Sequence, residues 1–204
     1  MAPVSFLRRL RRGRPIVVVS GLPRSGTSMA MKMLEAGGLP TLTDGLRRAD
    51  ASNPNGYYEF ERVKELDQAG DTAWLAAARG QAVKIISFLL TYLPESYDYQ
   101  VVFMRRDLAE VVSSQNQMLD AREEDRGAGD DRTMALYAQH LEQVERFLRQ
   151  RACFSTLMVD YAEVLADPGG QAAQINRFVG GRLDVDRMVA VAEPALYRNR
   201  RGAS

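Results

Sequence analysis

The chain has 204 residues, of which 46% are hydrophobic and 26% are charged, a composition typical of one globular domain. It contains one cysteine and one histidine, which excludes a disulfide framework and argues against a metal site. No apolar run approaches the roughly 18 residues of a membrane span, and residues 1–14 lack the apolar segment of a signal peptide. We therefore expect a cytoplasmic protein that needs no metal.

The net charge of +1 hides two basic ends. Residues 1–14 hold five arginines and residues 195–204 hold three, and neither segment contains an acid. We divide the chain into a basic tail over 1–14, one domain over 15–194 and a basic tail over 195–204. Such tails favour either weak contact with an anionic surface or plain solvation. The sequence leaves the oligomeric state open.

Short apolar, β-branched segments predict four buried strands, over 15–20, 81–86, 99–104 and 155–160. Helical patterns occupy 27–36, 107–119, 133–151 and 169–179, with glycines after the first helix and Asp107 as N-cap of the second. Strands that alternate with helices predict an α/β fold of three layers, with a central parallel sheet of four to five strands flanked by helices.

Two stretches interrupt this alternation. Residues 39–58 are rich in Asp, Asn, Pro and Gly and include Tyr57 and Tyr58, which favour burial, so we expect a substrate loop there. These tyrosines and Trp74 either line an aromatic pocket or belong to the core. Residues 120–132 are dense in charge and glycine, so we expect a mobile, solvated loop.

The most informative motif is GLPRSGTS over residues 21–28, between the first strand and the first helix. Glycines there let successive N–H groups converge on one anion, and the helix N-terminus adds partial positive charge. The spacing is that of a Walker A loop, but Thr27 stands where that loop has lysine and the basic residue is Arg24. The motif makes the expected fold P-loop-type. The alternative is a tight turn whose glycines serve geometry alone.

This motif resembles the 5′-phosphosulfate-binding loop of the sulfotransferases, P-[KR]-[SG]-G-T-[TS], in the variant with arginine found in the tyrosylprotein and bacterial branches. The resemblance implies that the donor is 3′-phosphoadenosine 5′-phosphosulfate (PAPS). It assigns donor binding to the loop residues Arg24, Ser25, Gly26, Thr27 and Ser28.

Two later segments agree with the resemblance. Arg106 and Ser114 have the spacing of the family's 3′-phosphate site, at the end of the third strand. Residues 159–180 are similar to the family's "YE-x-L-x-x-DP…I-x-x-FLG" stretch, which we interpret as structural, with a helix that begins at Asp167-Pro168. Alone, the second motif is also consistent with a capping aspartate beside exposed arginines.

The resemblance implies transfer of a sulfuryl group to a hydroxyl or amine of a small molecule or biopolymer. Arg24 would hold the leaving 5′-phosphate oxygen, with Lys84 as a second cation and Glu59 as general base. Ile86 stands where the cytosolic branch of the family has the histidine that acts as general base. Lys84 could instead be a lysine at a sheet edge, and Glu59 the start of a solvated helix. His140 lies within a predicted helix and is expected to be a surface or packing residue.

Two other functions remain open. A P-loop kinase of a small metabolite would need the missing loop lysine and would not explain the pair Arg106 and Ser114. A non-catalytic binder of adenosine 3′,5′-bisphosphate would keep the fold and lack the base, as Ile86 permits. No motif identifies the acceptor.

Overall fold

The computed structural model describes residues 12–45, 58–68, 71–121, 123–124 and 129–192. Residues 12–14 are the only described part of the two predicted tails. Tyr57, most of the predicted substrate loop, and residues 122 and 125–128 of the charged loop lie outside the described residues.

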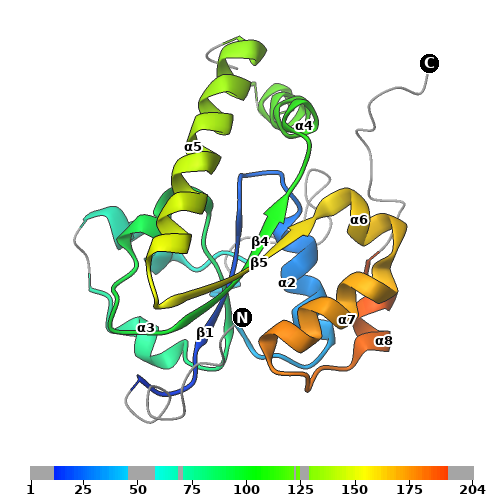
Figure 1. Ribbon diagram of the computed structural model, residues 1–204. Helices are drawn as coiled ribbons and strands as arrows, with labels where there is room; N and C mark the ends of the chain where they lie inside the picture. Colours follow the sequence, from blue (N-terminus) through cyan, green and yellow to red (C-terminus); the bar gives the residue numbers. More distant parts are fainter. Residues whose placement is uncertain (1–11, 46–57, 69–70, 122, 125–128, 193–204) are drawn as a thin grey trace.

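A parallel sheet of five strands forms the centre of the domain, in the order β2-β3-β1-β4-β5 (Figure 1). The strands are β1 (Ile16–Gly21), β2 (Thr41–Leu42), β3 (Ala82–Lys84), β4 (Tyr99–Arg105) and β5 (Phe154–Asp160). The predicted α/β fold is confirmed. β2 falls inside the stretch expected to be only a loop, because two residues are too few for a strand pattern in the sequence.

Helices cover both faces of the sheet (Figure 1). One face packs on α2 (Thr27–Ala36), α6 (Tyr161–Ala166), α7 (Pro168–Val179) and α8 (Val185–Ala190). The other packs on η1 (Glu61–Gln68), α3 (Trp74–Ala77), η2 (Ser87–Tyr92) and α5 (Asp130–Gln150), and α4 (Leu108–Asp120) lies against α5. Because strand side chains alternate, Val17 and Val19 enter one core and Ile16 and Val18 the other.

Aspartates begin several of these helices. Asp107 accepts hydrogen bonds from the main-chain N–H groups of Ala109 (3.0 Å) and Glu110 (3.2 Å), which confirms it as the cap of α4. Asp167 caps α7 in the same way, with Pro168 in the first turn as expected. Each cap contributes about 1 kcal/mol and fixes where its helix starts.

Tyr58, Phe60 and Trp74, which follow β2, pack against the hydrophobic cores of the two sheet faces. Trp74 is buried and meets Phe60 edge to face, with ring centroids 5.3 Å apart. Tyr58 donates a hydrogen bond to Glu35 (2.6 Å) on α2. The core interpretation of Trp74 is therefore the correct one. Across the described ranges, no helix combines the length and apolar character needed to cross a membrane.

Candidate functional site

The segment between β1 and α2 turns sharply. Gly21, Arg24 and Gly26 have positive φ angles of 146°, 68° and 99°. A Cβ atom on Gly21 would collide with Ser25 Oγ and the main-chain oxygen of Met104, and one on Gly26 would collide with the ring of Tyr161. Glycine is required at both positions because the loop is packed against its neighbours as well as curled.

The loop presents buried polar groups around the start of α2. Ser25, Thr27 and Ser28 are buried, and Ser25 Oγ has no hydrogen-bond partner among the described residues. α2 begins after Gly26, and no side chain of the described residues caps it. The first N–H groups of a helix have no intrahelical partners and carry the positive end of the helix dipole. These groups fit a bound anion such as phosphate or sulfate.

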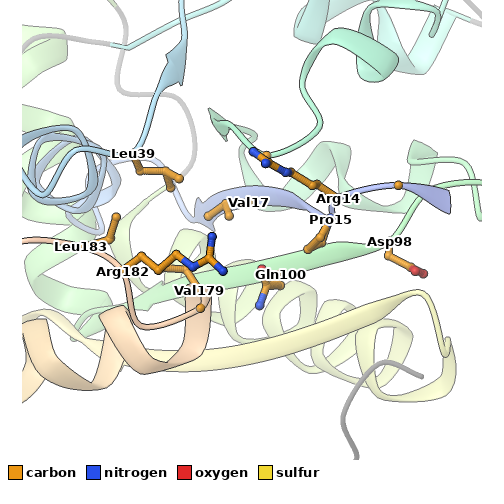
Figure 2. A pocket seen from close by; sticks show the side chains of 12 residues that line it. Arg14, Pro15, Val17, Leu39, Asp98, Gln100, Val179, Arg182 and Leu183 are labelled. Carbon is orange, nitrogen blue, oxygen red and sulfur yellow. The ribbon is translucent and has the colours of Figure 1, made fainter. Parts of the chain in front are cut away.

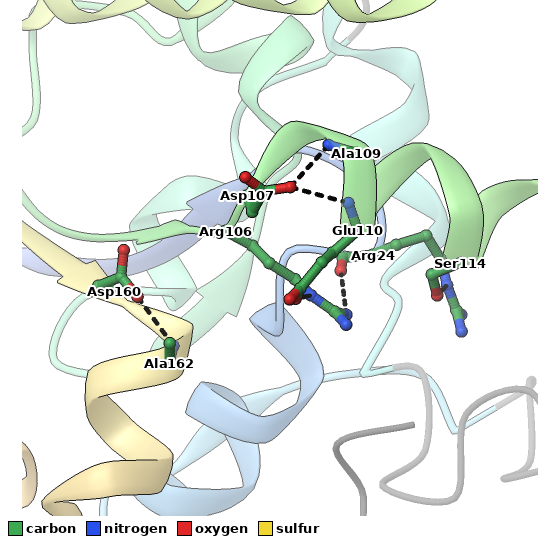
Figure 3. Close-up of polar contacts among 8 residues, drawn as sticks. All are labelled: Arg24, Arg106, Asp107, Ala109, Glu110, Ser114, Asp160 and Ala162. Atoms are coloured by element: carbon green, nitrogen blue, oxygen red, sulfur yellow. Dashed lines mark hydrogen bonds and ion pairs between the residues drawn. The ribbon is translucent and has the colours of Figure 1, made fainter. Parts of the chain in front are cut away.

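Arg24 reaches from this loop to α4. Its Nε donates a hydrogen bond to Ser114 Oγ at 3.0 Å, and Ser114 is buried (Figure 3). The contact joins a residue of the first predicted donor motif to a residue of the second. The two predicted motifs therefore meet at the carboxyl ends of β1 and β4, the edge at which open α/β sheets bind ligands.

Arg106, between β4 and α4, holds the loop at Arg24. Its Nε lies 3.0 Å from Glu110 Oε2, and its Nη1 donates to the main-chain oxygen of Arg24 at 3.2 Å (Figure 3). The side chains of Arg106 and Glu110 are only 9% and 8% exposed. The guanidinium also lies 4.7 Å from the ring centre of Tyr161. Arg106 is therefore fixed by the protein itself, in addition to any contact with a ligand.

Glu110 and Tyr161 are site residues that the sequence analysis did not single out. Glu110 could have been found, because it follows Arg106 by four residues at the start of a helix. Tyr161 lies in the stretch 159–180, which the sequence analysis interprets as structural. Burial raises the pKa of the Tyr161 phenol, and Arg106 opposes part of that rise. The phenol is thus neutral at physiological pH, and its ring packs from the start of α6 against Gly26 of the loop.

Lys84 and Glu59 belong to the other part of the predicted catalytic set. Lys84 ends β3 in register with Val19 on β1, at the same sheet edge as the loop. Glu59 precedes η1, and its main-chain oxygen accepts hydrogen bonds from Thr43 Oγ1 (3.0 Å) and the Asp44 N–H (3.2 Å). Both catalytic assignments stay predictions.

The side chain of Glu59 has an ionic neighbour. Its Oε2 lies 3.8 Å from Lys64 Nζ, and Lys64 also pairs with Glu61 at 2.7 Å. These ion pairs agree with the alternative interpretation, in which Glu59 is the start of a solvated helix. The two interpretations are compatible, since the Glu59 side chain is 24% exposed and accessible to a small acceptor.

Residues 57–184 match the model of the sulfotransferase family. This match covers more than half of the chain and begins after the loop at 21–28, so it and the loop motif rest on different residues. No curated protein sequence matches the chain significantly.

Several solved structures share the fold. The sulfotransferase domain of the olefin synthase from Synechococcus PCC 7002 is 17% identical, with a TM-score of 0.54 over 95% of this chain and 90% of that one. Sulfotransferase STF1 from Mycobacterium tuberculosis H37Rv is 19% identical, with a TM-score of 0.54 over 89% of this chain and 71% of that one. Retinol dehydratase, solved with retinol and PAP, is 18% identical, with a TM-score of 0.51 over 90% of this chain and 65% of that one.

Proposed function

The chain belongs to the sulfotransferase family and is a transferase enzyme, and on that premise we propose that it transfers a sulfuryl group from PAPS to a hydroxyl or amine. The observation that supports this donor best is the hydrogen bond between Arg24 and Ser114, because it brings two anion-binding motifs to one sheet edge. The PAP bound in retinol dehydratase, which shares the fold, supports the same class of nucleotide. A cytoplasmic location stays a prediction.

In this proposal the two motifs bind the two ends of the donor. Ser25, Gly26, Thr27 and Ser28 surround the 5′-phosphosulfate with main-chain N–H groups and hydroxyls at the start of α2. Ser25 Oγ, buried without a partner among the described residues, would gain one there. On α4, Ser114 would bind the 3′-phosphate together with Arg106, whose guanidinium suits a phosphate oxygen.

The catalytic residues act on opposite sides of the reacting sulfur. Arg24 neutralises the negative charge that grows on the 5′-phosphate oxygen as its bond to sulfur breaks, and Lys84 adds a second positive charge. Glu59 takes the proton that the acceptor loses while its oxygen or nitrogen bonds to sulfur. Fixed charges of this kind favour the transition state over the bound ground state.

Thermal-shift measurements with adenosine 3′,5′-bisphosphate, ATP and GTP test the donor site. We expect the bisphosphate to raise the melting temperature most, because ligands that bind only the folded state stabilise it. Preferential stabilisation by ATP or GTP would instead support a kinase.

Transfer of labelled sulfate from PAPS to a panel of hydroxyl and amine acceptors tests the activity. We expect labelled product from at least one acceptor class. Binding of the bisphosphate without any transfer across the panel would support the non-catalytic binder.

A further inference from the structure

A second potential ligand site lies at the opposite end of the sheet. A pocket of about 430 Å³ opens there, with Val17 of β1 and Gln100 of β4 in its wall (Figure 2). These two residues are register partners near the amino ends of their strands. Val17 and Gly21 are four residues apart along an extended strand, a span of roughly 13 Å, so the pocket is separate from the loop at 21–28.

The chemistry of the pocket wall is mostly apolar. Pro15, Val17, Leu39, Val179 and Leu183 contribute aliphatic surface, and the volume lies in the range of small-molecule sites. Its one lining carboxylate, Asp98, accepts a hydrogen bond from Arg12 Nη1 at 3.1 Å and is thereby paired with a cation.

Two arginines add positive charge to this apolar wall. Arg14 lies two residues before the start of β1, and Arg182 lies in the turn between α7 and α8. In Figure 2 the guanidinium of Arg182 extends between Val17 and Gln100. Neither arginine forms a hydrogen bond or ion pair within the described part of the chain. Two arginines that have no polar partner among the described residues thus line one apolar pocket.

Hydrogen bonds hold the turn that carries Arg182 in place. The main-chain N–H of Asp184 donates to the oxygen of Gly37 at 3.0 Å, which ties the turn to the end of α2. Leu183 N–H donates to Asn176 Oδ1 at 2.9 Å, which ties it to α7. A guanidinium mounted on such a turn loses little main-chain freedom when it binds an anion.

We propose that this pocket binds a small amphipathic organic anion, with a carboxylate, sulfonate or sulfate-ester group on an apolar body. The apolar body packs on Val17, Leu39 and Val179, and the anionic group binds Arg182 and Arg14. This site goes beyond the proposed sulfuryl transfer and does not depend on it.

Calorimetric titration of the full chain with octanoate, and with its neutral analogue octanamide, tests the proposal. We expect saturable octanoate binding and about tenfold weaker octanamide binding, since a charge-assisted contact is lost. The backbone amide NMR signals of Gln100 and Leu183, and the side-chain amide signal of Gln100, should shift on octanoate addition.

The variants are Arg182→Gln, Arg14→Gln and, as a matched control, Arg187→Gln on α8, which does not line the pocket. We expect Arg182→Gln to lower the affinity for octanoate about tenfold and Arg187→Gln to leave that affinity unchanged. All three side chains are exposed, and melting temperatures check that the fold is retained. Absence of saturable binding, equal binding of octanamide, or full binding by the Arg14→Gln/Arg182→Gln double variant would overturn the proposal. Displacement of octanoate by adenosine 3′,5′-bisphosphate would overturn it too, because it would place the anion at the donor loop.

Discussion

Arg24 Nε donates a hydrogen bond to Ser114 Oγ across 3.0 Å, although 90 positions separate the two residues in the chain. Arg24 holds a left-handed main-chain conformation, with φ 68°, which non-glycine residues adopt at a cost of about 1–2 kcal/mol. The bond to Ser114 and the hydrogen bond from Arg106 to the Arg24 main-chain oxygen offset that cost. The loop is thus held in shape by α4 before any ligand binds.

Replacing Arg24 with alanine tests its role in the proposed chemistry. We expect turnover to fall by about two orders of magnitude or more, since the positive charge acts mainly on the transition state. The affinity for adenosine 3′,5′-bisphosphate should fall much less. Rates of labelled-sulfate transfer and calorimetric titration measure the two quantities. Near-normal turnover in Arg24→Ala would remove it from the mechanism.

Replacing Arg106 with alanine separates bracing from ligand contact. Loss of the cation breaks the buried ion pair with Glu110, which costs about 3 kcal/mol of stability. We expect the affinity for adenosine 3′,5′-bisphosphate to fall about ten- to a hundredfold more than that for adenosine 5′-monophosphate. Arg105→Ala is the control, since Arg105 is 54% exposed and its Nη1 is 3.9 Å from Glu145. Equal losses of affinity for the two nucleotides would show that Arg106 only holds the loop in place and does not contact the 3′-phosphate.

Gly26→Ala tests how tightly the loop is packed. Gly26 and Gly38 have similar φ angles, 99° and 94°, but a Cβ on Gly26 meets the Tyr161 ring whereas one on Gly38 meets nothing within 4 Å. Gly38→Ala therefore reports the main-chain cost alone. We expect Gly26→Ala to lower the free energy of unfolding by about 2 kcal/mol more. Urea denaturation measures the free energy of unfolding of both variants. Equal losses in the two would show that the Tyr161 ring moves aside without cost.

His140 should make stability depend on pH. Its Nε2 lies 2.9 Å from Ser87 Oγ, its ring stacks on Phe88, and burial lowers its pKa below the ordinary 6.5. The unfolded chain therefore binds this proton more tightly than the folded one, so stability falls as pH drops below 6.5 and is unaffected by the group above it. Comparing wild type with His140→Gln by urea denaturation between about pH 5 and 8 isolates the effect. A constant difference across that range would contradict it.

Glu59→Gln tests the proposed base. The change keeps the size and hydrogen-bonding oxygen of the side chain but removes its ability to accept a proton, so turnover should fall by about 10²–10⁴-fold. Affinity for adenosine 3′,5′-bisphosphate should stay constant. Glu61→Gln is the matched control, because Glu61 shares the partner Lys64. If both variants retain turnover, another group takes the proton.

Local patterns predicted the fold well. The helix expected over 27–36 is α2 itself, because apolar residues face the sheet along its whole length and two glycines end it. β3 covers only part of its predicted range, because Ile86 begins the turn into η2. β2 was missed since it has two residues and depends on its pairing with β3.

The site was predicted only in part. The sequence placed Arg24 and Ser114 in separate motifs, and the fold brings them into contact. The buried pair of Arg106 and Glu110 and the Tyr161 ring depend on how β4, α4 and α6 pack together. Such tertiary contacts have no local signature, so the spacing of the motifs could not predict them.

The contact between Tyr161 and Gly26 also sets the order in which the protein can mature. Residues 21–28 leave the ribosome early, yet their surroundings include Ser114 from α4 and Tyr161, which follows the last strand of the sheet. A nascent chain that ends before residue 161 lacks the ring on which the loop rests. Anion affinity should therefore arise late in synthesis, after β5 has joined the sheet, and a ribosome-bound chain stalled before that residue should not retain the nucleotide.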